Sequence, residues 1–191
     1  KVITVDVDAN WAGCRRTRRS TSSAHIKIGN TLIKAISRTQ ATVALSSGEA
    51  EFQAICLGVA EGLWFQAMIE EVLGIKMKLV VRTDSTAAMG IATRAGPGRI
   101  KHLDLKSLFV QEVVAQGKVK IEKVGTKVNT SDLGTKHLTA ERMRELLELL
   151  QIKVDAVVDD DDGDEMTSSS APPPTTKTST TMKKVRYRKD E

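Results

Sequence analysis

The sequence predicts a mixed α/β fold, in which a five-stranded mixed sheet carries helices on both faces. Two observations predict this class. The first part of the chain holds alternating runs that are typical of strands and are joined by a hairpin signal. The later strands are instead separated by segments of helical periodicity. The expected order of elements is therefore βββαβααβα.

The early strands are predicted from alternation and from turn residues. Residues 2–8 alternate between apolar and polar side chains and lead into a turn-like segment at residues 8–13. Gly29-Asn30 separates two short apolar runs, residues 25–28 and 31–37, and this is a hairpin signal. Three strands in succession indicate an antiparallel meander.

A long helix follows. Ser46 and Glu49 have the spacing of a capping box, and apolar residues then recur near a period of 3.6 up to about Leu73. Gly74 is placed to end the helix. Glycines at positions 58 and 62 lie on one face of it, which would let the helix approach a sheet closely.

The second half of the chain alternates strands with helices. The expected elements are a strand at 79–82, a helix at 86–92, a helix at about 104–116, a strand at 118–124, a loop entering a short helix at 129–136, and a helix at 140–150 capped by Thr139. Asp84 lies between the fourth strand and the next helix, and by itself it has two interpretations. It could cap the helix, or it could be a functional carboxylate at the carboxyl end of a buried strand.

Composition bounds the class of protein. The chain has 191 residues, of which only 3% are aromatic, so the core must be aliphatic. Cys14 and Cys56 show neither metal spacing nor a disulfide framework, and no apolar run approaches the length needed to span a bilayer. No signal peptide is visible, and Lys1 begins directly in a strand pattern, so we expect a reduced, intracellular protein cut from a longer polypeptide.

The charge is unevenly distributed. The chain carries +5 overall, and residues 1–158 carry +7. We expect one domain over residues 1–152, followed by a disordered tail at 153–191 that is acidic, then rich in Ser, Thr and Pro, then basic. The basic domain favours a polyanionic partner, most simply nucleic acid.

Two interpretations stay open for a run of arginines near the start of the chain: it contacts phosphates, or it is an exposed, solubilising segment. Its members are Arg15, Arg16, Arg18 and Arg19.

Four carboxylates stand out by position. Asp8 ends the first strand, Glu51 lies early in the long helix, Asp84 ends the fourth strand, and Asp132 enters the last helical region. The ends of the first and fourth strands can be neighbours in a central sheet, and the long helix can bring Glu51 to them. Carboxylates are preferred ligands of Mg²⁺, and without a cation a cluster of them would repel.

The chain resembles the ribonuclease H domain at the end of the Pol polyprotein of copia-type LTR retrotransposons. Six motifs carry the resemblance in the family's order over roughly residues 2–140. They are Asp8-Ala9-Asn10-Trp11-Ala12-Gly13, Arg19-Ser20-Thr21-Ser22, the stretch VALSSGEAEF at 43–52, Thr83-Asp84-Ser85, Lys101-His102-Leu103-Asp104 and Asp132-Leu133-Gly134-Thr135-Lys136. Asn10, Cys14 and Gly48 depart from the usual pattern.

The resemblance implies a ribonuclease H-like fold and a two-metal endoribonuclease. It implies that Asp8, Glu51, Asp84 and Asp132 are the catalytic residues and the ligands of two Mg²⁺ ions, with Mn²⁺ as an alternative. The implied substrate is an RNA–DNA hybrid, whose RNA strand is hydrolysed during reverse transcription of the element. The implied partner is the reverse transcriptase domain of the same polyprotein, with no membrane and no disulfide partner. The location would be intracellular, either in a cytoplasmic retrotransposon particle or in the nucleus.

Two other functions are considered. The departures at Asn10 and Cys14, together with the tail, fit a catalytically inactive domain that binds or tethers nucleic acid. An integrase-like function shares the fold class but needs a different spacing of acids and usually a zinc module, for which the sequence offers no His/Cys pairing.

Overall fold

A single five-stranded sheet organises the protein. The computed structural model describes residues 1–95 and 105–153. The strand order is β3-β2-β1-β4-β5, so β1 lies at the centre. β1 (Val2–Asn10) pairs antiparallel with β2 (Thr21–Ile28), which pairs antiparallel with β3 (Thr31–Thr39). β4 (Lys78–Thr83) lies parallel to β1, and β5 (Val119–Lys123) lies parallel to β4. The predicted mixed sheet is confirmed.

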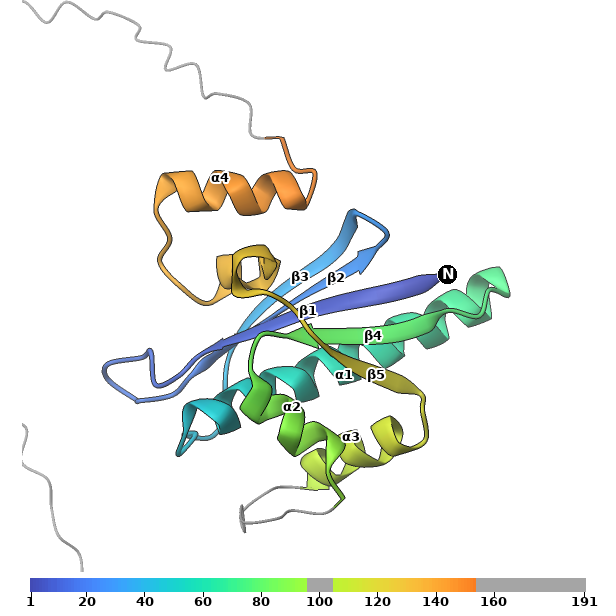
Figure 1. Cartoon of the computed structure of the whole chain (residues 1–191), viewed down its shortest axis with the longest axis horizontal. Helices are drawn as coiled ribbons and strands as arrows, with labels where there is room; N and C mark the ends of the chain where they lie inside the picture. The colour runs from blue at the N-terminus through green and yellow to red at the C-terminus, as the bar shows by residue number, and fades with distance from the viewer. Residues whose placement is uncertain (96–104, 154–191) are drawn as a thin grey trace, which may run out of the picture. The chain divides into compact units, whose positions relative to one another are not determined.

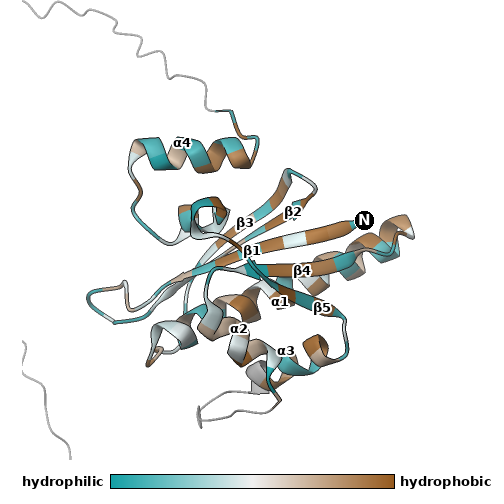
Figure 2. Ribbon diagram, in the orientation of Figure 1, coloured by the Kyte–Doolittle hydropathy of each residue, from teal (hydrophilic) through white to brown (hydrophobic). Residues whose placement is uncertain are grey.

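The helices occupy both sides of this sheet. They are α1 (Ser47–Leu73), α2 (Thr86–Thr93), α3 (Leu105–Ala115), the short 3₁₀ helices η1 (Thr126–Val128) and η2 (Thr130–Gly134), and α4 (Ala140–Leu149). Figure 1 shows α1, α2 and α3 on one side and α4 on the other. The apolar residues gather in β1, β4 and the first three helices, whereas α4 is largely polar (Figure 2). The element order is the predicted one, with the two 3₁₀ helices inserted before α4.

The two faces of β1 have different chemistry because successive side chains of a strand point to opposite faces. Val5 and Val7 are fully buried and lie against α1. Asp6 and Asp8 point to the other face, where Asp6 accepts from Thr130 of η2 and Asp8 accepts from Thr135, directly after η2. One strand therefore supplies both the apolar core and two buried carboxylates, at 0% and 1% exposure.

α1 packs closely on the sheet through its glycines, as predicted. A Cβ atom at Gly58 would lie 2.5 Å from Val7 Cγ1, and one at Gly62 would lie 2.7 Å from Leu79 Cδ1. Length and composition alone would also allow this helix to cross a membrane. In the structure its buried residues, among them Phe52, Ile55 and Val59, belong to the core that it forms with the sheet.

Because α1 has no room for a side chain at this contact, Gly58→Ala should destabilise the protein. We expect a loss of about 1–3 kcal/mol in the free energy of unfolding, the usual cost of overpacking a core. The matched control is Gly90→Ala in α2, where nothing lies within 4 Å of the added Cβ. That control should be neutral or should stabilise by about 0.5–1 kcal/mol, since alanine favours the helix. Urea denaturation measures both, and equal effects would contradict the close approach.

Two details refine the sequence-based expectation. The short helix expected within 129–136 is the 3₁₀ helix Thr130–Gly134, capped by Asn129, whose Oδ1 accepts from Ser131 N and whose Nδ2 donates to the Val7 carbonyl. β2 also begins earlier than expected, at Thr21. Lys101-His102-Leu103-Asp104 and, from residue 154, the predicted tail lie outside the described residues, so the predicted domain boundary stays a prediction.

Candidate metal centre

Three of the four predicted carboxylates converge at one end of the sheet. Asp8, Glu51 and Asp84 each offer an oxygen, and these oxygens all lie within 4.8 Å of one another. Asp8 comes from β1 and Asp84 directly follows β4, whose parallel pairing places both residues at the same end of the sheet. Glu51 comes from the first turns of α1, which lies across the neighbouring strands. Asp8 is buried, while the other two are partly exposed.

Local hydrogen bonds leave Asp84 available for this cluster. Ser85, not Asp84, caps α2: its Oγ accepts from Ala88 N at 3.2 Å. The buried Thr83 accepts from Ser85 N at 3.1 Å and so supports the same turn. The helix is therefore capped without the Asp84 carboxylate, so the capping interpretation is wrong and the functional one stays a prediction.

The two glutamates of the α1 motif have separate roles. Glu49 Oε2 accepts from Leu45 N at 2.9 Å, and its own N–H donates to the capping Ser46 Oγ at 3.1 Å. Ser46 therefore caps the helix, and the Glu49 carboxylate holds the residue before the cap. Glu51 lies one half-turn further on, and its Oε2 atom is buried without a hydrogen-bond partner among the described residues. Burial, followed by the charges of Asp8 and Asp84, raises the pKa of Glu51 to about 8.

This donor set fits a hard divalent cation. Carboxylate oxygens are the ligands that Mg²⁺ and Mn²⁺ take in proteins, and three of them surround one point here. The buried, unpaired Glu51 oxygen lacks a partner that a cation would supply. Asp8, Glu51 and Asp84 would thus hold one cation.

The raised pKa of Glu51 has a consequence for stability. An acid that is more easily protonated in the folded state stabilises the fold at low pH and loses that contribution as pH rises through its folded pKa. Between pH 4.5 and about 8, the metal-free protein should therefore lose on the order of 3 kcal/mol relative to Glu51→Gln, allowing for partial exposure. Urea denaturation of both proteins in EDTA measures the difference. Saturating Mg²⁺ should remove it, and a pH-independent difference in EDTA would contradict the assignment.

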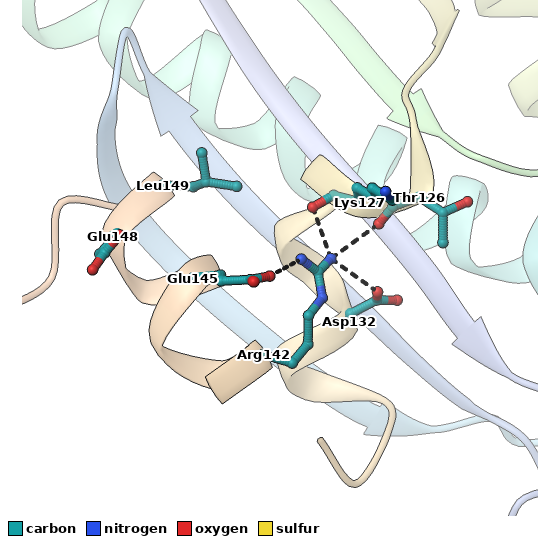
Figure 3. A pocket seen from close by; sticks show the side chains of 7 residues that line it. All are labelled: Thr126, Lys127, Asp132, Arg142, Glu145, Glu148 and Leu149. Atoms are coloured by element: carbon teal, nitrogen blue, oxygen red, sulfur yellow. Dashed lines mark hydrogen bonds and ion pairs between the residues drawn. The ribbon is translucent and has the colours of Figure 1, made fainter. Parts of the chain in front are cut away.

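The fourth predicted ligand, Asp132, lies apart from the cluster of three and is paired with cations of the protein. Its Oδ1 is 2.8 Å from Lys136 Nζ, and its Oδ2 is 3.9 Å from Arg142 Nη2. Arg142 also donates to the Thr126 and Lys127 carbonyls and pairs with Glu145 (Figure 3). Asp132, Arg142 and Glu145 line a pocket between η1 and α4, which none of the other three acids lines.

Lys136 joins Asp132 to the rest of the site. Its Nζ lies 3.2 Å from Asp8 Oδ2, so the ammonium bridges the two carboxylates. Burial would lower the pKa of Lys136, but its hydrogen bond to Asp132 and the charge of Asp8 raise it well above its usual value. Thr135 also donates to Asp8 Oδ2. Thr135 and Lys136 belong to a motif noted in the sequence, but the sequence analysis gave these two residues no role. They follow Asp132 by three and four positions, and this spacing could have indicated a contact with its carboxylate.

A second buried carboxylate, Asp6, connects η2 to the sheet through a hydrogen bond. The sequence analysis did not identify this residue. It pairs with Lys27 at 2.5 Å and with Arg82 at 2.7 Å, and it accepts from Thr130 Oγ1 at 2.9 Å. Burial would raise the pKa of Asp6, but the two cations together lower it below its usual value. Its position could have indicated this role, because Asp6 lies two positions before Asp8 and therefore on the same face of the strand.

The arginine run lies in the loop between β1 and β2, directly after the strand that carries Asp8. Its four arginines are exposed, and within the described residues none of them forms an ion pair. Trp11 Nε1 in the same loop donates to the Ala44 carbonyl at 3.0 Å, which ties the loop to the segment before α1. The run is therefore close in sequence and in element order to the cluster of acids, and its predicted contact with nucleic acid stays a prediction.

The fold defines the class of protein: the chain has a ribonuclease H-like fold. The structure of ribonuclease H1 from the halophilic archaeon Halobacterium salinarum superposes with a TM-score of 0.52 and 15% sequence identity. The matched region covers 71% of this chain and 95% of that one. At this identity the likeness concerns the fold alone. No family model matches the chain.

Its homologues are retrovirus-related Pol polyproteins of plant transposons. The polyprotein from transposon TNT 1-94 of Nicotiana tabacum is 30% identical over 145 residues, which are 75% of this chain and 11% of that protein. The polyprotein from transposon RE1 of Arabidopsis thaliana is 29% identical over 135 residues, 69% of this chain and 9% of that protein. The chain thus spans about a tenth of the length of these relatives. The predicted resemblance to the ribonuclease H domain of a copia-type Pol polyprotein is confirmed.

Proposed function

We propose that this domain is a Mg²⁺-dependent endoribonuclease that hydrolyses the RNA strand of RNA–DNA hybrids during reverse transcription of a retrotransposon. The observation that carries the proposal is the convergence of Asp8, Glu51 and Asp84, with one glutamate oxygen buried and unpaired. The homologous Pol polyproteins support the retrotransposon setting.

The site residues divide the chemistry among them. Asp8, Glu51 and Asp84 would hold one cation, and Asp8 with Asp132 would hold a second, so Asp8 belongs to both groups. Bound Mg²⁺ supplies an activated water and stabilises the leaving oxygen of the scissile phosphate. The protein fixes the carboxylates: parallel strand pairing positions Asp8 and Asp84, and the capped first turns of α1 position Glu51.

The exposed arginines of the β1–β2 loop would bind the phosphate backbone. Such contacts add affinity that salt removes, because each one releases condensed counterions. The hybrid, a reverse transcriptase domain of the same polyprotein, and a location inside the cell, cytoplasmic or nuclear, are parts of the same proposal.

The proposal is tested with the purified chain and end-labelled substrates. With Mg²⁺, a hybrid should be cut in its RNA strand only, while single-stranded RNA and duplex DNA of the same sequence stay intact, and EDTA should stop the cutting. An intact hybrid under these conditions would overturn the proposal. Salt-dependent binding of the hybrid without cutting would instead support the alternative, a catalytically inactive domain that binds or tethers nucleic acid.

A further inference from the structure

The two halves of the acidic site differ in how their negative charge is compensated. On the side of Glu51 and Asp84, a buried carboxylate oxygen has no partner. On the side of Asp132, Lys136 Nζ lies 2.8 Å from Asp132 Oδ1 and 3.2 Å from Asp8 Oδ2. Among the described residues Glu51 and Asp84 form no ion pair, and the only positive charge that acts on Glu51 is the more distant one of Lys136. The second half already contains a cation of the protein in direct contact with both of its carboxylates.

The position of Lys136 is that of a bridging ion between two carboxylates. Both carboxylates are nearly inaccessible to water, with side chains 1% and 7% exposed, whereas the Lys136 side chain is 41% exposed. Lys136 follows η2 in the segment before α4. A partly exposed, unbranched side chain can withdraw its charge from the site at a modest cost, which a buried one cannot.

We propose that Lys136 is an internal cation that occupies the position between Asp8 and Asp132 and has to be displaced before a second divalent cation binds there. The inference rests on the proposed function for the identity of the four acids. It assigns unequal affinities to the two positions: the one formed by Asp8, Glu51 and Asp84 binds a divalent cation more tightly, and the one shared by Asp8 and Asp132 binds more weakly because Lys136 competes. Lys136 is thereby a positioning residue that sets the metal requirement of the site.

Binding of Mn²⁺ to the full chain tests this without any nucleic acid. Calorimetric titration measures the binding, and electron paramagnetic resonance measures the concentration of free Mn²⁺. The wild type is compared with Lys136→Met, which keeps the length of the side chain and removes its charge. The second Mn²⁺ should bind at least about tenfold more tightly to this variant, since a competing charge within about 4 Å is gone. Lys127→Met, at an exposed lysine of η1, is the matched control and should stay within about twofold of the wild type.

Thermal unfolding supplies a second readout and guards against a variant that folds poorly. In EDTA, Lys136→Met leaves Asp8 and Asp132 without their shared cation, so its Tm should fall below that of the wild type. Mn²⁺ should then raise its Tm by more than it raises that of the wild type. At a given concentration, a ligand that binds the folded state more tightly stabilises it more. Lys136→Arg, which keeps the charge, should retain the weak second site.

The outcomes separate this inference from the proposed function. An unchanged or weaker second site in Lys136→Met, or no larger Mn²⁺-induced rise in its Tm, would overturn the inference even in a chain that cuts hybrids. A chain that cuts no hybrid but shows the tightened second site would overturn the proposed function and support the inference. Binding of one Mn²⁺ by the wild type and of two by Lys136→Met would also support it.

Discussion

Asp84→Asn should abolish Mg²⁺-dependent cutting of the RNA strand while leaving the protein folded. We expect a loss of at least about 100-fold in the cleavage rate, because changes outside the ligand set of a metal site already cost about 10–100-fold in affinity or activity. The substitution keeps the size of the side chain. It also keeps the cap of α2, which Ser85 provides. Gel analysis of an end-labelled hybrid measures the rate.

The matched control for Asp84→Asn is Glu49→Gln. Glu49 lies two residues from Glu51 on the same helix, but its carboxylate accepts a hydrogen bond from Leu45 N, just before the Ser46 cap. An amide oxygen can accept the same hydrogen bond, so cutting should stay near the wild-type rate. Cutting at the wild-type rate by Asp84→Asn would refute its assignment as a metal ligand. A comparable loss of cutting in Glu49→Gln would show that the loss is not specific to the assigned metal ligands.

Asp6→Ala should cost about 3–5 kcal/mol in the free energy of unfolding, the usual effect of removing one partner from a buried ion pair. The substitution leaves Lys27, whose side chain is 9% exposed, without its ion-pair partner. It also removes the acceptor to which Arg82 and Thr130 donate. Since Thr130 begins η2, the segment that carries Asp132 should loosen as well. Urea denaturation measures the stability, and hydrogen exchange of the η2 amides measures the loosening.

Glu61→Ala is the control for burial. Glu61 also pairs with two cations, Lys34 at 2.7 Å and Arg38 at 3.3 Å, but those two side chains are 37% and 61% exposed. Ion pairs that water reaches contribute about 0–1 kcal/mol, so this variant should lose little. Equal losses in the two variants would contradict the role given to burial of Asp6.

Much of the fold is predictable because its signals are local. Alternation in residues 2–8 gave the central strand, and the Ser46/Glu49 spacing together with Gly74 gave the start and end of α1. The hairpin at Gly29 was likewise visible, and Gly29 adopts the positive φ of 60° that such a turn needs. Each signal depends on hydrogen bonds and side-chain periodicity within a few residues, so it survives without knowledge of the tertiary fold.

The candidate site was only partly predictable. That Asp8 and Asp84 end neighbouring strands, and that α1 brings Glu51 to them, followed from topology and matches the observed cluster. The environment of Asp132 did not follow. Its ion pair with Lys136 becomes significant only because Lys136 also reaches Asp8, which lies 128 residues away in the sequence.

The sequence by itself determined the element order, the class of fold and the positions of the four acids at the ends of elements. The tertiary structure decided how their charges are compensated: an unpaired Glu51 oxygen on one side and Lys136 on the other. The physical reason is that periodicity and capping act over a few residues, whereas compensation depends on which charges meet in a poorly solvated interior. There a displacement of a few ångströms changes the interaction between two charges far more than it would in water.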